Sequence, residues 1–142
     1  MGAGLILSYG LLGIEGLLYI LPKDLKAKTR RLFAGRVSQY LPGSVQTFTD
    51  LQGSPVMVKR DARGFRAFSS VCPHLGCKVH WEADNERFFC PCHNGVFDAD
   101  GEPVSGPPAD AGQRLAEVPV TVDEDSGVVY LEVKDRKRKG RA

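Results

Sequence analysis

The cysteines and histidines of this chain are confined to one short stretch. All four cysteines and all three histidines lie within residues 72–93 of the 142. Six of them form two boxes, Cys-Pro-His-Leu-Gly-Cys at 72–77 and Cys-Pro-Cys-His at 90–93, and His80 stands between the boxes. Random scatter would not concentrate these residue types so tightly, so a metal or redox site is the first hypothesis. Any fold of this chain must therefore bring two loops together around that site.

Three kinds of site are compatible with the two boxes. A structural zinc ion could be held by two cysteines and two histidines, but the remaining two cysteines would then have no role. Two disulfides without a metal would account for the cysteines and leave the paired histidines unexplained. A third kind of site uses all six residues, with two cysteines and two histidines as ligands and the other two cysteines in a disulfide. The residue pattern alone leaves these possibilities open.

Residues 37–134 have the pattern of a small β domain. Strand-length runs rich in Val, Phe, Tyr and Thr are separated by turn sequences such as Leu-Pro-Gly at 41–43 and Asp-Ser-Gly at 125–127. The predicted strands are 44–49, 55–60, 64–70, 87–90, 118–122 and 127–133. We therefore predict an all-β head, a small antiparallel sandwich or open barrel, in which the two box loops form a subdomain.

The N-terminal segment 1–21 is predicted to be a single transmembrane anchor helix. Residues 2–21 contain one charge, Glu15, and a helix of that length is roughly 30 Å long, enough to cross the hydrocarbon core of a bilayer. Gly10, Gly13 and Gly16 recur at every third position, which would let another membrane helix approach closely. A secretory signal peptide is the main alternative, but the segment lacks a basic leader and an Ala-x-Ala cleavage site.

Charge is distributed unevenly along the chain. Residues 22–36 and 134–142 each hold six Lys or Arg and one Asp, whereas residues 37–133 hold seven basic and fourteen acidic residues. We interpret 22–36 as a basic juxtamembrane segment that is either a hinge or linker, with Gly35 and Pro42-Gly43 as pivots, or a lipid-binding segment, and 135–142 as a basic solvated tail. The acidic body gives no reason to expect a nucleic-acid partner.

The two boxes resemble the signature of Rieske iron–sulfur proteins, in particular the high-potential, disulfide-bearing type found in cytochrome bc-type complexes. The resemblance extends over roughly residues 36–134. It implies one 2Fe-2S cluster, in which two thiolates hold one iron and two neutral imidazoles hold the other. Carried over box by box, it gives Cys72, His74, Cys90 and His93 as ligands and a disulfide between Cys77 and Cys92. Oxygenase-type Rieske ferredoxins look similar but lack the additional cysteine in each box.

The same resemblance implies roles for residues beside the ligands. His93 would contact the quinol and accept its proton. Gly106, Pro107 and Pro108 resemble the loop that covers the cluster from a third side, although Gly and Pro are also common in simple turns. Leu75, inside the first box, would be an exposed apolar residue at the docking tip. His80 and Trp81 lie in a strand-like piece, and we expect a surface or packed histidine and a core tryptophan rather than ligands.

The function implied by the resemblance is electron transfer within a membrane complex. The chain would be a subunit of a quinol–cytochrome c (or plastocyanin) oxidoreductase and would not be catalytic alone. It would take one electron and one proton from quinol at a cytochrome b-type subunit and pass the electron to a c-type haem. The head would lie on the positive side of the membrane, periplasmic or lumenal, and membrane lipid would be a further partner of the chain. The basic residues after the predicted anchor conflict with this side, because such residues usually stay in the cytoplasm. The small Rieske subunit of an arsenite oxidase and a zinc-stabilised β module are the alternatives.

Two positions after the second box depart from the high-potential pattern, which continues Cys-Pro-Cys-His-Gly-Ser-x-Tyr. In this chain Gly95 and Phe97 stand where Ser and Tyr are common. Neither side chain can donate a hydrogen bond to a sulfur, and such bonds stabilise the more negative, reduced cluster. We therefore expect a lowered potential and a quinol of lower potential, menaquinol rather than ubiquinol.

Overall fold

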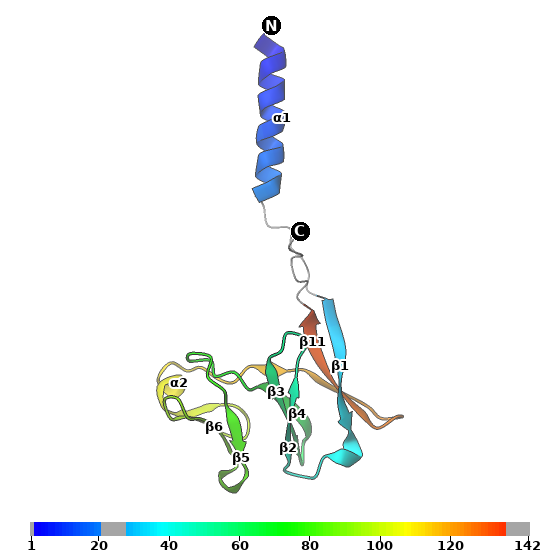
Figure 1. Cartoon of the computed structure of the whole chain (residues 1–142), viewed down its shortest axis with the longest axis vertical. Coiled ribbons are helices and arrows are strands. Elements are labelled where there is room, and N and C mark those ends of the chain that lie inside the picture. The colour runs from blue at the N-terminus through cyan, green and yellow to red at the C-terminus, as the bar shows by residue number, and fades with distance from the viewer. Residues whose placement is uncertain (1, 21–27, 136–142) are drawn as a thin grey trace.

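The computed structural model describes residues 2–20 and 28–135. In this part of the chain an N-terminal helix precedes a head built of short strands (Figure 1). Single 3₁₀ turns lie at Val37–Gln39 and Ala83–Asn85. In chain order, the helices and strands are α1 (Gly2–Ile20), β1 (Lys28–Arg36), β2 (Val45–Thr49), β3 (Pro55–Asp61), β4 (Gly64–Ser69), β5 (His80–Glu82), β6 (Arg87–Cys90), β7 (Gly95–Phe97), β8 (Pro103–Ser105), α2 (Pro107–Asp110), β9 (Glu117–Val118), β10 (Val120–Asp123) and β11 (Val128–Asp135).

The segment predicted as an anchor is helical over nearly its whole length, as α1. Its large apolar side chains are exposed, for example Leu11, Ile14 and Leu18. A Cβ added at Gly10, Gly13 or Gly16 would meet nothing within 4 Å. Within the described ranges, neither helix combines the length and the apolar character needed to cross a membrane.

The strands of the head form three antiparallel sheets. The first sheet has the order β1-β11-β10, the second β2-β3-β4-β9 and the third β5-β6-β7-β8. Figure 1 shows β1 and β11 beside the second sheet, with β5, β6 and α2 set to one side. The predicted all-β, antiparallel class is confirmed, and the third sheet with its loops forms the predicted subdomain.

The second sheet contributes side chains to two separate apolar cores. Successive residues of a strand point to opposite faces of the sheet. On β3, Val56 and Val58 therefore join one core with residues of the first sheet, whereas Met57 joins the other core with residues of the third sheet. On β4, Ala67 and Phe68 divide in the same way. A strand that is covered on both faces tends to have a continuous apolar sequence, as Pro55–Val58 of β3 does.

Tyr40 fixes the start of the head against the second sheet. Its ring is buried in the first core and packs edge-on against Phe65, with ring centroids 5.1 Å apart. Its hydroxyl donates to the carbonyl oxygen of Ala34 on β1, and burial raises the pKa of Tyr40 to about 12. Arg60 of β3 donates from Nη1 to the carbonyl oxygen of Tyr40 over 2.6 Å. These bonds tie β1 and the turn after it to β3.

Lys59 connects the second sheet to the third. It is one of the few buried charged residues in the described part of the chain. Its ammonium donates to the carbonyl oxygen of Ala99 over 3.2 Å, pairs with Asp61 over 3.5 Å and lies 5.2 Å from the centroid of the Trp81 ring. A buried charge is costly unless it is paired in this way, so these contacts hold the subdomain at a defined position on the second sheet.

The predicted linker at 22–36 is wrong for residues 28–36. They form β1, which pairs with β11 from Lys28 opposite Asp135 to Arg36 opposite Val128. Gly35, predicted as a pivot, lies in the irregular part of this pairing with a φ of 111°, and a Cβ there would be 2.9 Å from Oε1 of Gln39. The rest of the predicted linker lies outside the described residues. So does the predicted tail, apart from Asp135.

Candidate metal centre

The first box folds into a closed loop between β4 and β5. The amide of Cys72 donates to the carbonyl oxygen of Cys77 over 2.8 Å, and the amide of Gly76 donates back to Cys72 over 2.9 Å. Gly76 has a φ of 79°, a conformation that glycine adopts without strain. Leu75 lies at the tip of this loop and is 70% exposed, as predicted for a docking residue.

The second box is the turn between β6 and β7. Cys90 is the last residue of β6 and pairs with Gly95, the first residue of β7. Asn94 has a φ of 54°, which allows the chain to reverse over the four residues between these strands. The pairing of β6 with β7 therefore determines where the second box stands relative to the first.

The two loops meet, and they divide the four cysteines into two kinds. Cys77 and Cys92 form a disulfide between the loops, with Cα atoms 6.5 Å apart, so the predicted bridge is confirmed. Cys72 and Cys90 are free thiols, and both are buried. Each loop thus supplies one cysteine to the bridge and keeps one buried thiol.

The histidines of the two boxes also face one another. The rings of His74 and His93 lie 5.0 Å apart between centroids, at 83° to each other. His74 is partly buried and His93 is exposed. Two free thiols and two adjacent imidazoles are the mixed donor set that a Rieske-type cluster requires. Each of the two loops supplies one thiol and one imidazole. The residues present therefore fit such a group.

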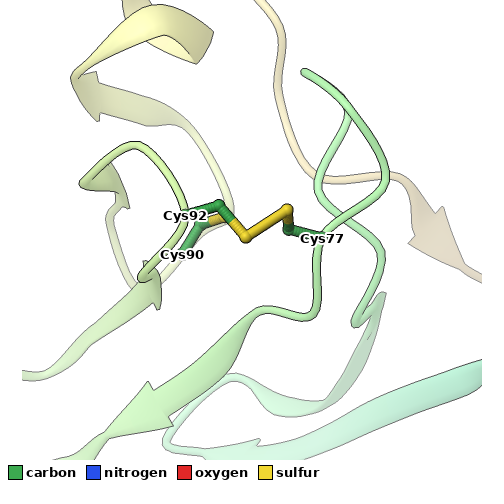
Figure 2. Close-up of side chains that lie close together, drawn as sticks. All are labelled: Cys77, Cys90 and Cys92. Carbon is green, nitrogen blue, oxygen red and sulfur yellow. A yellow bond between two sulfur atoms is a disulfide. The ribbon is translucent and has the colours of Figure 1, made fainter.

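Three sulfur atoms lie close together at this centre. Figure 2 shows Cys90 beside the disulfide, on the side of Cys92. The Sγ atoms of Cys77, Cys90 and Cys92 lie within 4.8 Å of one another. Two of these sulfurs are already used in the bridge, so Cys90 alone of the three offers a thiol to a metal.

The thiol of Cys72 is held in its neutral form by its surroundings. Burial raises the pKa of Cys72, and the neighbouring Cys90 thiol acts in the same direction. The backbone amides of His74 and Leu75 donate toward the sulfur and oppose this rise. A metal ion binds thiolate rather than thiol, so metal binding at Cys72 must release a proton.

A third loop closes on the second box. Gly106, the residue before α2, has a φ of 77°, and a Cβ at this position would lie 2.8 Å from the carbonyl oxygen of Asn94. Pro108 is buried against Gly95, whose added Cβ would lie 3.0 Å from Cγ of Pro108. The Gly106–Pro108 segment is therefore packed onto the turn that carries His93, and only glycine allows the approach at 106.

The remaining aromatic residues take the positions expected of them. His80 is half exposed and lies 3.7 Å from a carboxylate oxygen of Glu82, apart from the histidine pair. Trp81 packs against Phe88 with ring centroids 4.7 Å apart and joins the second core, which also holds Cys72 and Cys90. The sequence reasoning did not single out Val104 on β8, an apolar residue that precedes the third loop and is 59% exposed. Its position next to the Gly-Pro-Pro sequence could have drawn attention to it.

Comparison with known sequences supports this description of the centre. The profile of one family, described as Rieske [2Fe-2S] domain, matches residues 31–124. The cytochrome b6-f complex iron-sulfur subunit of Synechococcus elongatus is 36% identical over 97 residues, which cover 66% of this chain and 52% of that protein. The carotenoid phi-ring synthase of Chlorobaculum tepidum is 46% identical over 73 residues, 51% of this chain and 11% of that protein. The chain spans about half the length of the cytochrome b6-f subunits that it matches.

Solved structures show the same fold. The cyanobacterial plasma membrane Rieske protein PetC3 from Synechocystis PCC 6803 superposes with a TM-score of 0.60 at 24% identity, covering 72% of this chain and 99% of that one. The ferredoxin of carbazole 1,9a-dioxygenase from Nocardioides aromaticivorans IC177 gives a TM-score of 0.53 at 28% identity, covering 74% of this chain and 98% of that one.

Proposed function

Because the chain belongs to the Rieske [2Fe-2S] domain family, we propose that it is the electron-transfer subunit of a membrane quinol–cytochrome oxidoreductase of the bc type. Its cofactor is one 2Fe-2S cluster. The curated relatives from cyanobacteria are iron-sulfur subunits of cytochrome b6-f complexes. The inter-loop disulfide between Cys77 and Cys92 favours this class over the ferredoxins of oxygenases, in line with the two extra cysteines of the boxes.

The ligand assignment follows from which cysteines are free. We assign the thiolates of Cys72 and Cys90 to one iron and the neutral rings of His74 and His93 to the other. The observation that carries it is the division of the cysteines into a buried free pair and a bridged pair, with the two imidazoles in contact. When bound, the cluster supplies one-electron redox chemistry, and its two neutral ligands place the potential within about −150 to +300 mV.

The side chains around the centre have separate tasks. His93 is the more exposed histidine of the pair, so with the cluster bound its ring nitrogen that is free of iron would be available to the quinol hydroxyl and would accept its proton. Leu75 provides apolar contact at the tip. The Gly106–Pro108 loop packs onto the turn that carries His93 and supports it. The disulfide holds the two ligand loops at a fixed separation.

The proposed partners are a cytochrome b-type subunit and a c-type cytochrome. We assign α1 to the attachment of the chain to the membrane complex, because its large apolar side chains are exposed and such a surface favours contact with lipid or with another protein. The head lies on the positive side of the membrane, where a disulfide persists. Menaquinol is the favoured donor, since neither Gly95 nor the buried Phe97 carries a hydroxyl near the cysteines of the second core.

The test is to purify the tagged full chain from membranes of its host and to measure three properties. We expect iron rather than zinc, a rhombic Rieske EPR signal after reduction, and b- and c-type haems that copurify with the chain. Zinc in place of iron would exclude the cluster. An intact Rieske signal without any copurifying haem would exclude the complex.

A matched pair of variants tests docking at the tip. Leu75→Asp places a charge on the exposed residue of the first box, whereas Leu51→Asp does the same on a turn of the second sheet where Leu51 is also exposed. We expect Leu75→Asp to slow quinol oxidation in the purified complex with an unchanged EPR signal. Leu51→Asp should leave the rate unchanged. Equal rates in both variants would contradict docking through Leu75.

A further inference from the structure

The free thiol of Cys90 lies directly beside the disulfide that joins the two box loops. Its Sγ is within 4.8 Å of both sulfurs of the bridge between Cys77 and Cys92. Figure 2 shows Cys90 on the side of the bridge that belongs to Cys92, away from Cys77. A thiol and a disulfide therefore share one small space, at the point where β6 ends in the second box.

The chemistry open to this arrangement is thiol–disulfide exchange. In this reaction a thiol sulfur attacks one sulfur of a disulfide and displaces the other, and no oxidant or reductant is consumed. Attack from the side of Cys92 forms a bond between the sulfurs of Cys90 and Cys92 and breaks the bond between those of Cys92 and Cys77. The proton that Cys90 gives up passes to the departing sulfur of Cys77. The chain holds one disulfide and two free thiols both before the step and after it.

The two disulfide isomers differ in how they connect the loops. The original bridge joins the first box to the second, whereas a bridge between Cys90 and Cys92 lies wholly within the second box. The backbone hydrogen bonds that close the first box run within it, from Cys72 to Cys77 and from Gly76 to Cys72. The exchanged isomer therefore keeps a closed first box that has lost its covalent tie to the second box.

Burial separates the exchange thiol from reagents outside the chain. Cys90 is 2% exposed and Cys72 is 3% exposed. Cys77 is only partly buried, and Cys92 is exposed. A soluble thiol reagent therefore reaches Cys90 slowly, whereas the neighbouring disulfide is always close to it. Once displaced, the sulfur of Cys77 is easier to reach than either buried thiol.

We propose that Cys90 acts as an internal exchange thiol in the cluster-free chain, where it opens the bridge between Cys77 and Cys92 and leaves Cys77 free. This inference rests on the proposed function in one respect, that iron bound at Cys90 removes its sulfur from the exchange. A bridge across the single residue Pro91 closes a tight ring, and strained disulfides are the more easily broken ones. The reverse attack by Cys77 therefore restores the original bridge and frees Cys90 as a ligand.

The experiment maps the disulfide of the full chain, prepared without cluster and kept under argon. N-ethylmaleimide captures Cys77 as it is released and prevents the reverse step. Trypsin places the first box in peptide 67–78 and the second box in peptide 88–114, so the original bridge links these two peptides. We expect the linked pair to be lost over time, with 88–114 carrying an internal disulfide and no maleimide. Maleimide on both cysteines of 88–114 would show reduction of the bridge instead and would overturn the proposal.

Two variants that each lack one free thiol form a matched pair. Cys90→Ser removes the attacking sulfur, whereas Cys72→Ser removes the other buried thiol of the same core. We expect the peptides of Cys72→Ser to separate as fast as those of the unaltered chain, and the peptides of Cys90→Ser to stay linked. Equal separation in both variants would overturn the proposal, and so would peptides that stay linked in the unaltered chain.

A dilution series on the unaltered chain tests the exchange without any variant. The thiol and the disulfide belong to one chain, so the rate of separation should not depend on the concentration of the chain. A rate that rises in proportion to concentration would show attack between chains and would overturn the proposal. In a chain loaded with cluster, as verified by its EPR signal, the separation should be lost.

Other outcomes separate this inference from the proposed function. If the cluster-free chain exchanges its bridge but never gives a Rieske EPR signal after reconstitution with iron and sulfide, the cluster fails and the exchange stands. If the chain gives the signal and its cluster-free form keeps the two peptides linked, the exchange fails and the proposed function stands. Separation that continues unchanged in the loaded chain would overturn the protection of Cys90 by iron.

Discussion

At the scale of single residues, each of the four proposed ligands should be indispensable, because its removal leaves an iron atom without a donor. Ala at Cys72, His74, Cys90 or His93 should abolish the Rieske EPR signal and lower the bound iron. His80→Ala is the matched control, since this histidine is half exposed and contacts Glu82 instead. Iron analysis and EPR of the purified full chain are the measurements. A full signal in any ligand variant would contradict the assignment.

The residues at 95 and 97 should tune the potential. Gly95→Ser with Phe97→Tyr adds two hydroxyls close to the ligand cysteines, because a Cβ at 95 would lie 3.5 Å from Cβ of Cys90 and Phe97 shares the second core with Cys72 and Cys90. Reduction adds negative charge, so a donated bond strengthens in the reduced form. At about 1 kcal/mol per hydroxyl, each adds on the order of 40 mV for one electron. Voltammetry should show a rise of somewhat under about 100 mV.

Steric effects at Gly95 need their own control. An added Cβ would lie 3.0 Å from Cγ of Pro108, so part of any change could come from displacement of the third loop. Gly95→Ala brings the same Cβ without the hydroxyl. It should leave the potential nearly unchanged while Gly95→Ser raises it. Equal shifts in the two variants would mean that no hydroxyl reaches a sulfur, and the preference for menaquinol would lose its basis.

The proposed ligand residues could be picked out from the sequence, whereas the residues that support their loops could not. Cysteine and histidine are rare, so two boxes within residues 72–93 indicate a centre without knowledge of the fold. The sequence Gly-Pro-Pro at 106–108 is equally compatible with a simple turn. Its special role depends on the close approach of Gly106 to the carbonyl oxygen of Asn94, a contact that only the folded chain contains. The burial of Lys59 beside Trp81 is likewise a product of sheet packing.

At the scale of elements, the disulfide should stabilise the two box loops more than it supports iron binding. Cys77 and Cys92 are 15 residues apart, and closing a loop of that length is worth about 3 kcal/mol. Cys77→Ser with Cys92→Ser should still assemble some cluster but lose it faster on warming or dilution. The measurement is the decay of the visible absorption of the cluster over time. Decay at the rate of the unaltered protein would contradict a role for the bridge in retention.

The elements that the sequence missed were hidden by charge, shortness or proline. β1 carries several basic residues, yet Leu32 and Ala34 alternate toward the first core, and its charged residues occupy the other face or the ends. β7 is only three residues long, too short to show a period of two. The run at 118–122 was predicted as one strand. Pro119 divides it into β9 and β10, which pair with β4 and β11 in different sheets.

At the scale of the whole molecule, the three sheets of the head pack in series, with the second sheet between the first and the third. The first sheet holds the first and last strands of the head, the second shares a core with each of the others, and the third carries the second box. Among the described residues, the two apolar cores link the first sheet to the third by way of the second sheet. Lys59 and the paired cores therefore make the head one unit, and a change of its orientation carries the ligand loops with it.

If β1 is part of this unit rather than a linker, a head that lacks it should be unstable. A fragment of residues 28–135 should fold, whereas 37–135 should be largely unfolded, because loss of β1 exposes the fully buried Leu131 and the nearly buried Val133. Each such side chain contributes about 1.5–3 kcal/mol when buried. Removal of the carbonyl of Ala34 also leaves the buried Tyr40 hydroxyl without its acceptor. The combined loss is a large share of the roughly 5–15 kcal/mol that holds a domain folded.

A fragment of residues 31–135 is the matched control for this comparison. It starts where the family match begins and keeps Leu32 and Ala34, the residues of β1 that face the first core. Urea unfolding followed by circular dichroism should give similar unfolding midpoints for fragments 28–135 and 31–135. The midpoint of fragment 37–135 should be far lower than both. Equal midpoints for 28–135 and 37–135 would show that β1 adds nothing to the head. In that case the pairing with β11 would not be needed for folding, and residues 28–36 could act as the linker first predicted from their charge.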